Sequence, residues 1–165
     1  MQYLQGWLVG EENTTGVLVP FELAVRVGTN QVTSSGPVSC DVMSSFHLGI
    51  WSTQLLLHRN GITYTPSDFH LHLPLHQTKG FGPSCRLSFA HAVISAFVST
   101  SSTTHDTVLT GDLNLCGDVL PVGGLLNKVN AACAVGFKSI IVPDAQPEAI
   151  NGVVRIRHLQ DLLEG

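Results

Sequence analysis

Charge is scarce in this sequence. Asp, Glu, Lys and Arg together make up only 12% of the 165 residues, whereas hydrophobic residues make up 44%. No run of Lys or Arg occurs and the net charge is −4, so the chain lacks the basic surface that binds nucleic acids or anionic membranes. A surface this poor in charge is consistent with packing against other domains or subunits.

Long hydrophobic runs are missing as well. No apolar stretch approaches the roughly 20 residues that a membrane-spanning helix needs. The N-terminus, MQYLQGWLVGEEN, has neither the basic start nor the apolar centre of a signal peptide. Cys40, Cys85, Cys116 and Cys133 form no C-x-x-C pair, which argues against a zinc site and favours a reducing compartment. We therefore expect an intracellular protein, in the cytoplasm or in an organelle matrix.

The pattern of strands and helices predicts the α+β class. A chain of this length can form one domain, 1–165, with a core of its own. The patterns mix strands and helices without alternating strictly, which favours α+β over a doubly wound sheet. The expected order is strands on both sides of a turn at 10–16, a loop at 28–39 with room for one short strand, a helix at 42–58, a strand at 68–74, a helix at 84–98, a polar loop at 99–106, two strands around Gly117, a helix at 122–136, strands at 138–143 and 153–156, and a short helix at 158–165.

A serine stands at the mouth of the predicted helix in KGFGPSCRLSFAHAVISAF, residues 79–97. Ser84 is either a helix cap or a nucleophile. A helix N-terminus gathers unpaired N–H groups and a positive dipole end, which suit a developing oxyanion. Because Pro83 has no N–H, the expected donors are the N–H of Ser84 and one from Gly82 or Phe81.

A candidate base for Ser84 follows in the segment GGLLNK. Lys128 has the apolar neighbours Leu125, Leu126 and Val129. If Lys128 faces inward, burial lowers its pKa and leaves a neutral amine that can accept the serine proton. A lysine whose amine reaches solvent is the alternative on these residues alone.

Both segments resemble those of a known family. KGFGPSCR is similar to P-K-D-G-P-S-A-G, and TGDLNLCGDVLPVGGLLNK, residues 110–128, is similar to T-G-E-I-x-L-x-G-x-V-L-P-[IV]-G-G-[LI]-x-x-K. DFHLHLP resembles D-I-H-V-H-V-P, CDVMSS resembles G-D-V-M-x-E-S, and FKSIIVP and VVRIRHLQDLL resemble the closing motifs. These patterns are those of the C-terminal proteolytic domain of Lon, the ATP-dependent protease. The resemblance is weakest before Ser39.

The resemblance implies a fold, an activity and roles for three residues. The fold would be the Lon proteolytic-domain fold, with mixed sheets packed against helices, in a domain that usually works as a hexameric ring. The implied activity is hydrolysis of peptide bonds in polypeptide substrates. Ser84 would attack the carbonyl, Lys128 would be the general base, and Thr110 would hydrogen-bond and orient the lysine. Such chemistry needs neither histidine nor metal.

The sequence departs from the family pattern close to the implied site. Phe81 stands where the family commonly has aspartate, and Cys85 and Arg86 replace Ala and Gly. Cys116 stands where arginine is common. These changes predict a shifted specificity or a reduced activity, whereas the intact pair of Ser84 and Lys128 favours an active enzyme.

Three histidines suggest a different chemistry. His70 and His72 share one face of a predicted strand, and His76 follows four residues later, a spacing that could hold a metal ion. No fourth ligand is evident, and the family strand carries the same two histidines without a metal. We therefore expect no metal.

A serine–histidine–aspartate triad is a second catalytic alternative. It would combine Ser84 with His70 or His72 and with Asp106 or Asp112. The resemblance favours the lysine as base.

No phosphate-binding G-x-x-x-x-G-K-[ST] loop occurs in the sequence. We therefore expect no cofactor in this chain, and ATP and Mg²⁺ only through an ATPase module outside it. Without an unfolding module, the chain should cut peptides and unfolded proteins but not folded ones. The alternatives are an inactive Lon-like domain that serves ring assembly or partner binding, and a protease that cuts mainly its own precursor.

Overall fold

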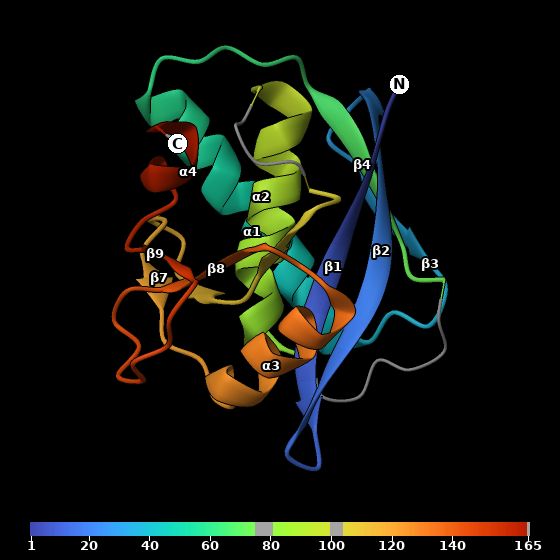
Figure 1. Ribbon diagram of the computed structural model, residues 1–165. Coiled ribbons are helices and arrows are strands. Elements are labelled where there is room, and N and C mark those ends of the chain that lie inside the picture. The colour runs from blue at the N-terminus through green and yellow to red at the C-terminus, as the bar shows by residue number, and fades with distance from the viewer. Residues whose placement is uncertain (75–80, 100–103, 165) are drawn as a thin grey trace.

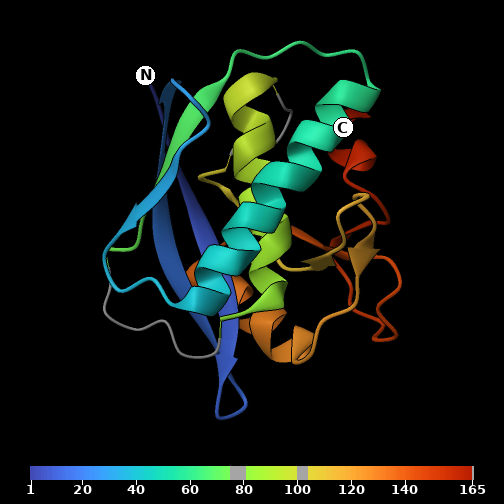
Figure 2. The ribbon, with the colours of Figure 1, turned by 180° about the vertical axis from the view of Figure 1, so that it is seen from behind.

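The chain folds into layers of the α+β class, as predicted. The computed structural model describes residues 1–74, 81–99 and 104–164. Helices α1 and α2 run between a four-stranded sheet and two smaller sheets (Figures 1 and 2). The large sheet has the order β1-β2-β4-β3, with β1 (Gln2–Glu12), β2 (Thr15–Val27), β4 (Ser67–His72) and β3 (Val32–Ser35).

The turn between β1 and β2 is tighter than predicted. The two strands pair up to Glu12 and Thr15, and only Asn13 and Thr14 form the turn. Both turn residues have positive φ, 49° and 65°, as in the hairpin turns whose twist matches that of the strands. The predicted turn at 10–16 was therefore too long, and Glu11 belongs to β1.

Two long helices form the middle layer. α1 (Cys40–Arg59) is capped by Ser39, whose Oγ accepts a hydrogen bond from the N–H of Val42 at 3.2 Å. It ends as predicted before Gly61, which has a φ of 66°. α2 (Arg86–Phe97) is buried along almost its whole length, because one side faces the large sheet and the other faces the small sheets.

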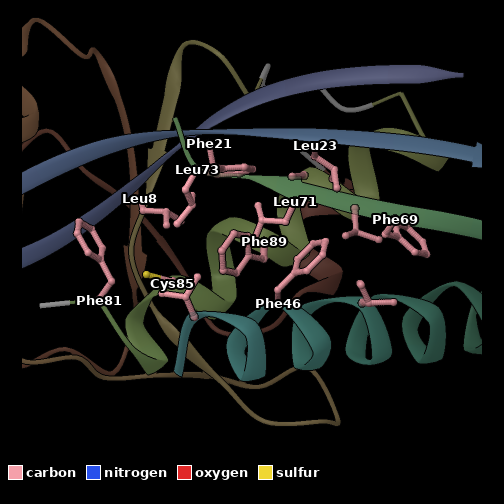
Figure 3. Close-up of a cluster of buried hydrophobic side chains, with 14 of the residues drawn as sticks. Leu8, Phe21, Leu23, Phe46, Phe69, Leu71, Leu73, Phe81, Cys85 and Phe89 are labelled. Carbon is pink, nitrogen blue, oxygen red and sulfur yellow. The ribbon is translucent and has the colours of Figure 1, made fainter. Parts of the chain in front are cut away.

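An aromatic core lies between the large sheet and these helices (Figure 3). Phe46 of α1 and Phe21 of β2 both contact the ring of Phe89 in α2, at centroid distances of 5.2 and 5.3 Å. The predicted alternation in β4 is confirmed, since Phe69 and Leu71 point into this core. We use the name aromatic core for its buried members: Leu8, Val19, Phe21, Leu23, Val25, Val42, Phe46, Ile50, Phe69, Leu71, Leu73, Phe81, Cys85, Phe89, Ala92, Val93 and Ala96.

The smaller sheets follow on the other side of α2. One holds the parallel strands β5 (Thr107–Leu109), β8 (Ser139–Pro143) and β9 (Val154–Ile156); the other is a hairpin of β6 (Asp112–Leu113) and β7 (Val119–Leu120). The two strands predicted around Gly117 are confirmed as the hairpin of β6 and β7. The stretch before Gly117 also holds a further strand, β5, which belongs to a different sheet and was not predicted. The predicted polar loop at 99–106 lies partly outside the described residues.

Two further helices complete the fold. α3 (Leu125–Val135) lies beside the β1–β2 hairpin, and α4 (Gln160–Glu164) lies near the C-terminus (Figure 1). α3 ends as predicted at Gly136, whose φ of 105° is one that residues with a side chain rarely adopt. The start of α3 contacts the end of β1, where Asn127 donates a hydrogen bond to Glu11.

Candidate active site

Ser84 lies in a single 3₁₀ turn, Pro83–Cys85, that precedes α2. The prediction that the helix begins at Ser84 was wrong by two residues. The Gly82 carbonyl accepts hydrogen bonds from the N–H of Cys85 and from the hydroxyl of Ser45, each at 3.0 Å. No side chain caps this turn or α2, so the structure does not support the interpretation of Ser84 as a helix cap.

Two buried side chains anchor the turn on either side of Ser84. Phe81 and Cys85 are only 6% and 1% exposed and both belong to the aromatic core (Figure 3). Burial raises the pKa of the Cys85 thiol to about 12, so this thiol is neutral at pH 7. Because its ring is committed to the core, Phe81 can offer a substrate little besides its backbone.

The turn is also tied to the segment that follows β5. Gly111 donates its N–H to the carbonyl of Ser84 at 3.1 Å and accepts from the N–H of Leu87 at 3.2 Å. Arg86 forms an ion pair with Asp112, with 2.9 Å between Nη1 and Oδ1. The arginine beside the candidate nucleophile is thus engaged within the protein.

Lys128 is buried, which decides between the two alternatives that its apolar neighbours left open. It lies in the first turns of α3 and is only 5% exposed. Burial lowers its pKa, and the opposing influences are the negative charges of Cys85 and Glu11. Since the Cys85 thiol is neutral at pH 7, only the negative charge of Glu11 opposes the lowering of the Lys128 pKa at that pH. Lys128 therefore has the environment of an amine that gives up its proton more readily than usual.

Thr110 does not make the hydrogen bond that was predicted for it. The residue is 1% exposed and its N–H donates to the carbonyl of Ile141 at 3.1 Å. Its Oγ1, however, is buried without any hydrogen-bond partner among the described residues. An unpaired buried hydroxyl is uncommon and costly, which makes it a feature to be explained.

A surface cavity of about 500 Å³ brings the candidate groups together. Ser84 and Lys128 both line it, and so do Phe81 and Gly82. A Cβ atom added to Gly82 would have no protein atom within 4 Å, so this glycine leaves room beside the serine. The two members of the predicted pair, 44 residues apart in the sequence, thus face one cavity.

Glu11 also lines this cavity, and sequence reasoning missed it. Its carboxylate accepts a hydrogen bond from Asn127 Nδ2 at 2.8 Å. A Cβ atom on Gly124 would lie 2.1 Å from Glu11 Oε2, so the carboxylate is packed against the start of α3. The signal that could have found it is the hairpin: a two-residue turn carries β1 as far as this site.

A free backbone donor is present next to the serine hydroxyl. Among the described residues, the N–H of Ser84 has no hydrogen-bond acceptor. It is one of the donors predicted for an oxyanion. The second predicted donor, the N–H of Gly82 or Phe81, comes from the same stretch of backbone at the edge of the cavity.

His70 and His72, the histidines of the alternative triad, do not line the cavity. The ring of His70 contacts the hydroxyls of Thr33 and Ser35 at 2.7 and 2.8 Å, and Nδ1 of His72 also contacts Ser35, at 2.7 Å. These residues alternate with the core-facing ones of β4 and therefore lie on the outer face of the large sheet. The alternative triad with Ser84 is not assembled here.

The two aspartates of that triad are separated as well. Asp112 lines the cavity but is paired with Arg86, whereas Asp106 lines a different cavity beside Trp7. In the part of the chain that the structure describes, no group of three or more His, Cys, Asp and Glu could hold a metal ion. The third histidine of the metal alternative, His76, lies outside that part.

Over the same described residues, no helix is long and apolar enough to cross a membrane.

Comparisons with known proteins point to one family. The sequence profile of the Lon protease (S16) C-terminal proteolytic domain matches residues 11–161. The chain is 34% identical over 129 residues to the Lon protease of Methanosarcina barkeri and 30% identical over 132 residues to that of Erwinia amylovora. These alignments cover 76% and 78% of this chain but only 16% and 17% of the relatives. The chain therefore spans less than a fifth of the length of the curated relatives it matches.

Proposed function

Because the chain belongs to the Lon protease (S16) C-terminal proteolytic domain family, we propose that it is a serine peptidase domain with Ser84 as nucleophile and Lys128 as general base. One observation carries this proposal: Ser84 and a buried lysine of lowered pKa line the same cavity. A lysine of this kind can activate a serine hydroxyl, which is a poor nucleophile while it keeps its proton.

The proposed reaction proceeds in two halves. The neutral amine of Lys128 takes the proton from Ser84 Oγ as that oxygen attacks the peptide carbonyl. The N–H groups of Ser84 and of Gly82 or Phe81 would stabilise the resulting oxyanion. The Lys128 ammonium then gives its proton to the departing amine, which leaves an ester on Ser84. Water, deprotonated by the same lysine, releases the second product.

Thr110 keeps a supporting role in this proposal. The resemblance places Thr110 beside Lys128, and its buried Oγ1, which has no partner among the described residues, would be an acceptor for the ammonium that Lys128 becomes during the reaction. Such an acceptor would stabilise the protonated state for as long as the proton is needed. The bond is absent in the resting structure and would form only in that state.

The substrates we propose are unfolded polypeptides and peptides. The chemistry assigned to Ser84 and Lys128 needs no metal and no cofactor from this chain. Unfolding of stable proteins would require an ATPase module, and the relatives are more than five times as long as the matched region. We also propose assembly into rings of identical subunits, hexameric in the full-length context, in keeping with the resemblance.

The first test is cleavage of casein by the wild type and by Ser84→Ala and Lys128→Ala. We expect kcat/KM to fall by about a thousandfold or more in both variants, as for members of other catalytic pairs. Matched controls are Ser44→Ala and Lys138→Ala, which change exposed residues away from the cavity. Activity that persists in Lys128→Ala would move the base to another residue. A wild type that cleaves neither casein nor short peptides would favour the inactive, partner-binding alternative.

A further inference from the structure

One wall of the cavity has little secondary structure to hold it. The segment from Pro121 to Gly123 lies between β7 and α3 and lines the same cavity as Ser84. Pro121 has no N–H, and Val122 belongs to neither a helix nor a strand. Backbone groups in such a segment need partners from elsewhere in the fold.

A single side chain supplies both partners for Val122. The Gln146 amide accepts from the Val122 N–H at 3.0 Å and donates from Nε2 to the Val122 carbonyl at 2.7 Å. Gln146 is only 6% exposed, so water does not compete strongly for these bonds. The amide thus pairs with Val122 as a neighbouring strand would.

The loop that carries Gln146 is itself fixed. Arg155 of β9 donates to the carbonyl of Gln146 at 3.1 Å, and also to the carbonyl of Glu148. A third bond, 3.5 Å long, reaches the carbonyl of Asp144. Through these contacts the position of the cavity wall is linked to β9, a strand of the parallel sheet.

The wall is shaped for a close contact with a ligand. A Cβ atom on Gly123 would meet no protein atom within 4 Å, and its φ lies outside the left-handed region. The fold therefore does not require glycine at this position. The same holds for Gly82 on the serine side, with a φ of −160°. Two glycines on the cavity lining leave room for an extended peptide backbone to approach closely.

We propose that Gln146 is a positioning residue for substrate binding: it holds the Pro121–Gly123 wall at the distance that an extended polypeptide requires. This role rests on the proposed peptidase function. Gln146 touches neither Ser84 nor Lys128, and α3 is held by its own buried residues, such as Leu125 and Val129. Loss of the amide should therefore weaken substrate binding and spare the chemical step.

The test compares Gln146→Met, which keeps the side-chain length but removes the amide, with the wild type. We expect KM for an unstructured peptide to rise about tenfold and kcat to stay within about twofold, because two hydrogen bonds are lost from the wall alone. Amide exchange at Val122, followed by NMR, should become at least about tenfold faster. The matched control is Gln160→Met, whose amide is bonded to Asn60 far from the cavity and should change none of these values.

The outcomes separate the possibilities. If KM is unchanged while kcat falls in proportion to the folded fraction, Gln146 has only a structural role and the proposal is wrong. Unchanged exchange at Val122 would also overturn it. Should Gln146→Met fail to fold, Gln146→Asn, whose amide is one methylene too short for both bonds, must show the same rise in KM. An inactive wild type would instead overturn the proposed function itself.

Discussion

Two places in this molecule combine a serine, a basic side chain and a carboxylate. On the outer face of the large sheet, Ser35 contacts His72, whose other ring nitrogen lies 3.8 Å from Glu22. At the cavity, Ser84, Lys128 and Glu11 line one space. The outer set has one hydrogen bond of a catalytic triad, between serine and histidine, with a carboxylate nearby, whereas no hydrogen bond joins Ser84 to Lys128 at the cavity.

The outer set nevertheless lacks what catalysis needs. Ser35 is exposed and pairs with His72 in the ladder between β3 and β4, and Glu22 and His72 remain partly exposed, so water solvates all three groups. At the cavity, burial of Lys128 lowers its pKa, and the Ser84 N–H has no acceptor among the described residues and is available to an oxyanion. Desolvation and a spare donor, more than a chain of hydrogen bonds, distinguish a reactive serine.

The largest expected effect is the contrast between the two serines. Ser35→Ala and His72→Ala should leave kcat/KM for casein within about twofold, because they lie on the opposite side of the sheet from the proposed site. Ser84→Ala should lower it by about a thousandfold or more. Both sets of variants are compared by steady-state kinetics at equal folded fractions, verified by circular dichroism. A large loss of activity in Ser35→Ala would reverse the comparison.

A smaller effect is expected from the carboxylates of the two sets, Glu11 at the cavity and Glu22 on the outer face. Because burial lowers the Lys128 pKa, activity should rise with pH to a midpoint below the value of about 10.4 for an unperturbed lysine. Glu11 raises the Lys128 pKa, so Glu11→Gln should shift this rise to lower pH and increase kcat/KM a few-fold near pH 7. Glu22→Gln on the outer face is the control and should leave the profile in place. A shift to higher pH in Glu11→Gln would contradict the assignment of Lys128.

The smallest effect is on stability. A lysine whose pKa is lowered in the folded state binds fewer protons there than in the unfolded state at pH values between the folded-state pKa and about 10.4. Wild-type stability should therefore rise with pH through that window. Lys128→Met should raise the free energy of unfolding at pH 7 by about 0.5–2 kcal/mol, the range of ordinary stabilising substitutions, and by less at higher pH.

Urea denaturation at pH 7 and at a higher pH measures the free energy of unfolding of the wild type and of Lys128→Met. The exposed control is Lys138→Met, for which we expect a change within about 0.5 kcal/mol. If the buried lysine instead stabilises the fold, Lys128→Met would lower the free energy of unfolding.

Local patterns predicted the parts of the site that depend on local sequence. The apolar neighbours of Lys128 made its burial one of two alternatives, and the alternation in β4 placed His70 and His72 together on one face. The glycine-rich entry to α2 placed Ser84 beside open space, although the one-turn 3₁₀ helix was not foreseen.

The missed features are contacts between distant segments. Gln146 reaches Val122 across 24 residues, and Asn127 reaches Glu11 across 116, so no periodicity or motif reports either contact. The expected bond from Thr110 to Lys128 failed for a related reason. A shared motif indicates that two residues are close, but the rotation of a hydroxyl is decided by local packing.

The close packing of Gly124 against Glu11 has a consequence for the evolution of this chain. A side chain at position 124 would require the carboxylate at position 11 to move away from the start of α3, and the positive φ of 64° adds a backbone penalty. The two positions should therefore vary together in sequence. Related chains that keep an acidic residue at position 11 against this helix should retain the glycine at position 124.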